Sequence, residues 1–173
     1  MNKDNLKQID NLTKPRYDEI FSLGYDGINS VTLKYAEFKT TGVFHKAIHS
    51  VARKHLEGIL LDKYKYDKIM NNFVTPEDYE WGVYPQLIPR RDRSPRSGRK
   101  AMIYYDSTPE KFKVAAENAI KCVEGRDMDH RLIFLNAWNE WGEGGILEPD
   151  KENGFDYLNA IKKALECEKN ANI

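Results

Sequence analysis

The sequence predicts an α/β fold, because short apolar runs alternate along the chain with amphipathic helical segments. The clearest helix is expected over 109–123, where a Ser-Thr pair can cap the first turn and the following proline sacrifices no hydrogen bond. The clearest strand is expected over 132–135, a continuous Leu-Ile-Phe-Leu run of the kind that parallel sheets bury on both faces. An amphipathic helix over 155–167 follows and completes a strand–helix unit.

The rest of the chain carries weaker signals of the same alternation. A strand is expected within 24–33 and a helix over 43–56, whose apolar residues recur at three- and four-residue steps. A short helix over 64–73 and a strand over 81–88 follow. No repeat or low-complexity tract interrupts the sequence, so we expect one domain over residues 1–173.

Composition argues against several classes of protein. The 173 residues carry 27 Lys plus Arg and 27 Asp plus Glu, so a general electrostatic grip on nucleic acid or on an anionic membrane is not expected. The apolar runs are far shorter than the roughly 20 residues that cross a bilayer, and the polar start contains no secretory signal. We therefore expect a cytoplasmic protein without a membrane span. The two cysteines lack close partners and are expected to stay reduced.

The residues after the strand over 132–135 combine side chains that suit a sugar. Two indoles offer apolar platforms, amides offer donors and acceptors, and two carboxylates stand three residues apart at the strand end where parallel-sheet enzymes gather their active sites. Glycosidic bond chemistry needs one carboxyl group for the leaving-group proton and another to support the attacking group. The candidate catalytic residues are Glu140 and Glu143, and the candidate sugar-binding residues are Asn136, Trp138, Asn139 and Trp141.

Two interpretations of this segment remain open from the residues alone. If the segment turns helically at its start, the three-residue step places Glu140 and Glu143 on the same side. Alternatively, the acids cap the next helix or face water, and the indoles pack at a rim.

The segment resembles the WbsX-like glycosyltransferase family, which is similar in turn to glycoside hydrolase family 99. The strings that carry the resemblance are NAWNEWGEG at 136–144, LEPD at 147–150, GFDYLNAI at 154–161, and, upstream, 84–94 and STPEKF at 107–112. The resemblance covers about residues 17–165. It implies a (β/α)8 TIM-type barrel with its site at the carboxyl ends of the strands. Because eight strand–helix units need about 250 residues, this chain is expected to hold only the C-terminal portion, an incomplete barrel.

The resemblance also implies roles for individual residues. Glu140 corresponds to the base that acts on the sugar's own 2-hydroxyl group, and Glu143 corresponds to the acid that protonates the leaving oxygen. Asn139 and Trp141 would shape the site. The related hydrolases often have His where this chain has Gly142. The family's aromatic-Asp-Asn-Thr stretch is replaced here by Arg-Asp-Arg-Ser at 91–94.

A basic loop lies at the start of the second half of the chain. Its six positive charges within eleven residues are Arg90, Arg91, Arg93, Arg96, Arg99 and Lys100. Nucleic acid is not expected to bind here, because the cluster is local and no aromatic residue interleaves with it. The loop either binds the diphosphate of an activated sugar or lipid carrier or is simply solvated. Asp92, Arg93 and Arg96 are therefore further candidate substrate-binding residues.

We expect a carbohydrate-active enzyme that acts on a glycosidic bond in the assembly of a surface polysaccharide such as the lipopolysaccharide O-antigen, with a sugar donor or oligosaccharide as substrate. Two alternatives remain: an endo-mannosidase-like glycoside hydrolase, and a non-catalytic sugar-binding or assembly fragment. No cofactor or metal is expected, because the His45–His49 pair lacks a third ligand. Only three strand–helix units are recognisable, so we expect weak or no activity from the isolated chain, with a second chain completing the barrel.

Overall fold

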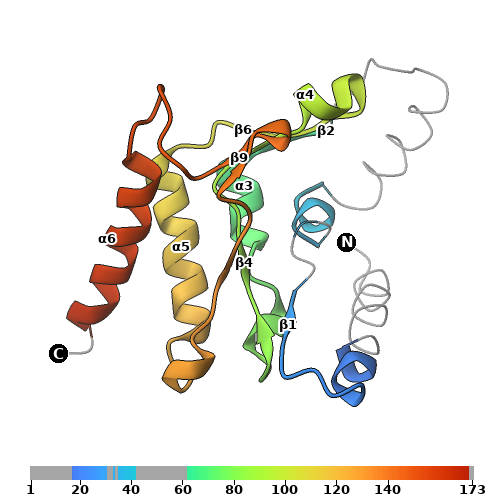
Figure 1. Ribbon diagram of the computed structural model, residues 1–173, viewed down its shortest axis with the longest axis vertical. Helices are drawn as coiled ribbons and strands as arrows, with labels where there is room; N and C mark the ends of the chain where they lie inside the picture. Colours follow the sequence, from blue (N-terminus) through green and yellow to red (C-terminus); the bar gives the residue numbers. More distant parts are fainter. Residues whose placement is uncertain (1–16, 31–32, 34, 42–61, 172–173) are drawn as a thin grey trace.

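The computed structural model describes residues 17–30, 33, 35–41 and 62–171. This part of the chain is a mixed α/β arrangement of small sheets, and it contains no closed barrel. Two long helices, α5 (Pro109–Val123) and α6 (Asp156–Ala171), lie side by side on one flank of the strands (Figure 1). The α/β class is therefore confirmed, whereas the partial barrel stays a prediction.

Three parallel segments lie beside one another in chain order. The middle segment consists of β3 (Val83–Tyr84) and β4 (Gln86–Leu87), which are separated at Pro85 because proline has no N–H group to donate to a ladder. Strand β1 (Ile28–Asn29) pairs with β3 in parallel, and β7 (Phe134–Leu135) pairs with β4 in parallel. The strands expected within 24–33 and over 81–88 thus exist, the second as two short pieces with different partners.

A second sheet contains strands that the sequence analysis missed. Strand β6 (Met102–Tyr105) lies between β2 (Asp62–Lys65), which is parallel to it, and β5 (Arg91–Asp92), which is antiparallel. The helix expected over 64–73 begins only after β2, as α3 (Tyr66–Ile69) and the 3-10 turn η1 (Met70–Asn72). Strand β2 depends on hydrogen bonds to residues about 40 positions away, and local periodicity does not record such pairing.

The helix expected over 109–123 has these bounds in the structure. The Thr108 hydroxyl group accepts a hydrogen bond from the Lys111 N–H at 3.3 Å and caps the first turn. The apolar face of α5 is buried against α6 and the strands. Its buried members are Phe112, Ala115, Ala116, Ala119, Ile120 and Val123. On the facing helix, Tyr157, Ala160 and Ala164 are buried, so small side chains let the two helices approach closely. Helix α6 extends to Ala171, beyond the expected end at 167.

The expectation of a strand over 132–135 buried on both faces was wrong in extent and in burial. Only Phe134 and Leu135 form β7, and the side chains of Leu132 and Phe134 are each 46% exposed. Among the described residues, β7 pairs with β4 alone. An apolar run therefore reaches solvent at an edge where a doubly covered strand was expected.

The remaining elements are short. They include η2 (Pro76–Tyr79), α4 (Ser94–Ser97), η3 (Gly98–Lys100), η4 (Met128–His130), β8 (Asn139–Glu140), η5 (Trp141–Glu143) and β9 (Gly145–Ile146), and residues 17–22 and 35–41 are also helical. The helix expected over 43–56 lies outside the described residues. Cys122 and Cys167 both carry free thiols, as expected. Across the described ranges, no helix combines the length and apolar character that a bilayer crossing requires.

Candidate functional site

The predicted sugar-binding segment forms a hairpin directly after β7. Strands β8 and β9 pair antiparallel, with Asn139 opposite Ile146 and Glu140 opposite Gly145, and the 3-10 turn η5 joins them. Glu140 ends β8 and Glu143 ends η5. The three-residue step that separates the two acids thus spans a single tight turn at the tip of the hairpin.

Gly144 fixes the hairpin against the basic loop. Its φ of +61° is left-handed, and a Cβ atom there would lie 2.7 Å from the Asp92 backbone nitrogen in β5. Only glycine fits both the backbone conformation and the close approach. The acidic turn η5 and the arginines of β5 and α4 are consequently held together.

The Glu143 carboxylate is surrounded by guanidinium groups. Arg91 Nη2 lies 2.8 Å from Oε2, while Arg93 Nη2 and Arg96 Nη1 lie 3.2 Å and 3.1 Å from Oε1. The Glu143 side chain is only 16% exposed, whereas that of Glu140 is 49% exposed. We call Arg91, Arg93 and Arg96 the arginine triad. Such charge-assisted contacts fix the position of a carboxylate more firmly than contacts between neutral groups do.

The two acids face a common cation. Arg96 Nη1 lies 3.1 Å from Glu143 Oε1 and 3.9 Å from Glu140 Oε1, so the two carboxylates converge on one guanidinium group. The structure therefore brings Glu140, Glu143, Arg93 and Arg96 together, although they come from two segments almost fifty residues apart.

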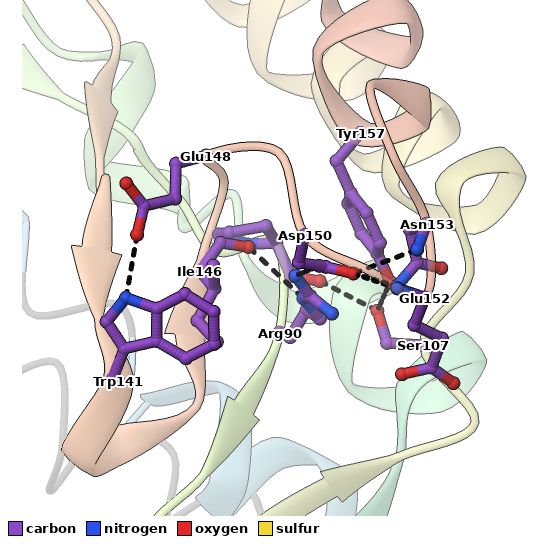
Figure 2. A network of polar contacts seen from close by, with 10 residues as sticks. Arg90, Ser107, Trp141, Ile146, Glu148, Asp150, Glu152, Asn153 and Tyr157 are labelled. Atoms are coloured by element: carbon purple, nitrogen blue, oxygen red, sulfur yellow. Dashed lines mark hydrogen bonds and ion pairs between the residues drawn. The ribbon is translucent and has the colours of Figure 1, made fainter.

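The aromatic candidates lie on the same hairpin with their indoles exposed. The Trp141 Nε1–H donates to Glu148 Oε1 at 2.7 Å, which holds this ring at the turn (Figure 2). The Trp138 carbonyl accepts from the N–H groups of Leu147 and Glu148. Both rings thus have fixed backbones and solvent-facing surfaces, as stacking against the C–H face of a sugar requires.

The other candidate residues have different places. The backbone N–H of Asn136 extends the β7 ladder by donating to the Leu87 carbonyl at 2.9 Å. Asn139 is exposed on β8. Asp92 Oδ1 accepts from the Ser94 N–H at 2.8 Å and from its hydroxyl group, so this carboxylate caps the turn at α4. In this structure Asp92 therefore organises the loop that carries Arg93 and Arg96.

The sequence did not predict the partly buried polar network that lies beside the hairpin. Arg90 donates from Nε to the Ile146 carbonyl and from Nη2 to Asp150 Oδ2, and its guanidinium group lies 4.7 Å from the centre of the Tyr157 ring (Figure 2). Burial alone would raise the pKa of Asp150. The N–H groups of Asn153 and Glu152 and the Arg90 guanidinium outweigh that effect and lower this pKa to about 2. The sequence analysis placed Arg90 in the basic loop, whereas in the structure its side chain contacts β9, the turn before α6 and Tyr157 of α6.

A separate hollow of about 600 Å³ lies between η1, η2 and α5, lined by residues such as Asn72, Tyr79 and Lys121. Neither acid of the hairpin and none of its indoles reach this hollow. The hairpin itself offers exposed indoles and paired carboxylates beside a cation, an arrangement that suits a carbohydrate ligand. The hairpin is therefore a candidate site for a carbohydrate-active class of protein.

Comparison with known proteins agrees with this class. The family model Glycosyltransferase WbsX matches residues 3–161, so the chain belongs to the WbsX glycosyltransferase family. The chain is also similar to the uncharacterized protein WxcX of Xanthomonas campestris pv. campestris, in strains B100 and ATCC 33913, with 34% identity over 87 residues in each case. That match covers 50% of this chain and 12% of WxcX. No solved structure matches the chain.

Proposed function

We propose that this chain is part of a glycosyltransferase of surface-polysaccharide assembly and that Glu140 and Glu143 act on the glycosidic bond of a sugar donor. The convergence of the two carboxylates on Arg96, beside the exposed Trp138 and Trp141, carries the proposal. An oxocarbenium-like transition state needs two carboxyl side chains that act on the same sugar ring, and the indoles supply a stacking surface next to these side chains. Membership of the WbsX family supports transfer to a sugar hydroxyl group over transfer to water.

The two acids are placed for different roles. Glu140 is half exposed and has one long ionic contact, so its carboxylate is accessible to a ligand hydroxyl group. Glu143 has both oxygens paired with arginines, which orients it strongly but occupies it. We propose that Glu140 is the base and that Glu143 serves as the acid once substrate has rearranged its ion pairs. These are also the roles that the resemblance to glycoside hydrolase family 99 implies.

We further propose that β1, β3 with β4, and β7 are neighbouring strands of a (β/α)8 barrel. Their parallel direction, their side-by-side order along the chain and the position of α5 and α6 on one flank support this arrangement (Figure 1). The half-exposed apolar side chains of β7 would be covered by the next strand, supplied by a second chain or by further sequence of a longer protein. The site would then open at the barrel mouth. We also propose a cytoplasmic location, where activated sugars are made.

The test compares the chain, joined by the second chain or further sequence that completes the barrel, with its Glu140→Gln and Glu143→Gln variants, using a panel of nucleotide sugars with oligosaccharide acceptors and mass spectrometry of the products. Loss of general acid–base assistance should lower turnover about 10²–10⁴-fold in either variant. Glu166→Gln, on the exposed part of α6, is the matched control and should keep full turnover. Turnover retained by Glu140→Gln would refute the assigned role.

A non-catalytic sugar-binding fragment is the second candidate, because three arginines already occupy the Glu143 carboxylate. In that case the chain would show no turnover, and Glu140→Gln would bind oligosaccharide as well as the original chain does. Calorimetric titration with the same acceptors measures this directly.

A further inference from the structure

The arginine triad has more hydrogen-bonding capacity than Glu143 uses. Each guanidinium group carries five N–H donors in a rigid fork, and the triad meets one carboxylate from three directions. The Nε atoms of Arg91 and Arg93 are buried and have no hydrogen-bond partner within the part of the chain that the structure describes. Buried unpaired donors are costly, so they indicate a ligand that can supply further acceptors.

The burial of Arg91 shows that the triad is built into the fold. Its side chain is only 8% exposed, and its strand β5 pairs with β6, so the backbone that carries the guanidinium group is fixed by the sheet. Arg93 and Arg96 are progressively more exposed at 33% and 59%. A ligand can therefore approach from the side of Arg96 and reach the inner donors.

A phosphate group fits this triad better than a carboxylate does. It presents three oxygens, carries more negative charge and accepts bidentate pairs from arginine. The triad lies beside the Glu140 carboxylate, and its segments, β5 and α4, contact the turn η5 of the hairpin that carries the two exposed indoles. A diphosphate at the triad would therefore adjoin a sugar at the indoles.

We propose that Arg91, Arg93 and Arg96 form a diphosphate-binding site for the donor substrate and that the Glu143 carboxylate fills this site in the present structure. The inference rests on the proposed function and names the anionic part of its substrate. Binding of the diphosphate displaces Glu143 from the guanidinium groups, and the released carboxyl group turns toward the sugar. Donor binding and the placement of Glu143 are thus one event.

The test is a calorimetric titration of the 173-residue chain with inorganic pyrophosphate. The double variant Arg93→Ala, Arg96→Ala should lose at least about tenfold in affinity, since two charge-assisted contacts are removed. Lys100→Ala removes one positive charge from the same loop at an exposed position and should stay within about twofold. Equal affinity of the double variant and the original chain would overturn the proposal.

Glu143→Gln gives the sharper result. Removing the competing carboxylate should increase the affinity for pyrophosphate by about tenfold, whereas a triad that only anchors Glu143 would show no gain. The pyrophosphate-induced rise in melting temperature, measured in parallel, reports binding even if this variant is less stable. No gain in affinity and no larger rise in melting temperature would overturn the proposal.

Two competitors identify the source of the diphosphate. Displacement of pyrophosphate by UDP supports a nucleotide-linked donor, and displacement by geranyl diphosphate supports a lipid-linked one. If neither displaces it, the donor-site proposal is overturned. These titrations need neither acceptor nor turnover, so an inactive Glu140 leaves their outcome unaffected and the two proposals fail separately.

Discussion

The two ends of the central strand segment use arginine in different ways. At the start of β3, Arg126 donates to three backbone carbonyls, those of Asp78, Glu80 and Val83, and lies 5.3 Å from the centre of the Tyr84 ring. Beyond the end of β4, the arginine triad instead surrounds one side-chain carboxylate. Backbone carbonyls cannot leave their places without unfolding the loop, whereas a glutamate side chain can rotate away.

The comparison separates structural cations from exchangeable ones. Arg126 donates to carbonyl groups of the η2–β3 connection, and its loss would remove a charged donor from each of them. The triad holds a partner that a stronger anion can replace. A cluster of arginines therefore becomes a candidate ligand site when its acceptor is mobile, and a structural tie when its acceptor is the main chain.

The largest effect is expected from Arg126→Ala. Three carbonyls would lose a charged donor, so the free energy of unfolding should fall by about 2–4 kcal/mol. Pyrophosphate affinity of the molecules that remain folded should stay the same. Urea denaturation followed by tryptophan fluorescence measures the first quantity, and titration below the transition measures the second. A variant that folds normally but loses pyrophosphate binding would contradict the division between the two ends.

A somewhat smaller loss is expected from Gly144→Ala. The new Cβ atom would clash with the Asp92 backbone and push the hairpin off β5, which should cost about 1–3 kcal/mol and weaken pyrophosphate binding. Gly154→Ala is the control, because Gly154 also has a positive φ of +51° but meets no atom within 4 Å. The control should lose about 1 kcal/mol and keep its affinity. Equal affinities in both variants would show that the hairpin does not depend on this contact.

The smallest effects concern two carboxyl groups whose pKa values are shifted in opposite directions. Asp150, with its pKa lowered to about 2, stabilises the fold above its ordinary pKa, and this contribution is lost as the pH falls toward 2. Burial raises the pKa of Asp78 and outweighs the hydrogen bond from the Thr75 N–H at 2.6 Å. The contribution of Asp78 to the stability of the fold is therefore present below its ordinary pKa, and it is lost as the pH rises through the raised pKa.

Asparagine at each position tests this contrast. At pH 7, Asp150→Asn should lose about 1–2 kcal/mol, because Arg90 loses a charged partner. Asp78→Asn should be neutral or slightly stabilising, because an amide oxygen can still accept from Thr75. Denaturation at pH 7, 5 and 3 measures the free energy of unfolding of each variant relative to the original chain. Both of these free-energy differences should shrink as the pH falls. Parallel stability curves for the two variants would contradict the assigned directions.

The elements that could be predicted are those whose signal is local. Helix α5 carries its own cap at Thr108 and a complete apolar face, so its bounds follow from sequence. Strand β6 has no such signal, because its place depends on β2 and β5. The apolar run at β7 predicted a strand correctly, but it did not reveal that the Phe134 side chain is about half exposed.

For the candidate site, the sequence by itself determined which side chains the hairpin carries, two acids and two indoles, and the family to which the chain belongs. Only the tertiary structure decided that Glu143 meets three arginines from a segment almost fifty residues away, and that Arg90 leaves the basic loop to pair with Asp150. The physical reason is that residue type fixes what a side chain can bind, whereas long-range strand pairing and the close contact at Gly144 fix which partners it meets.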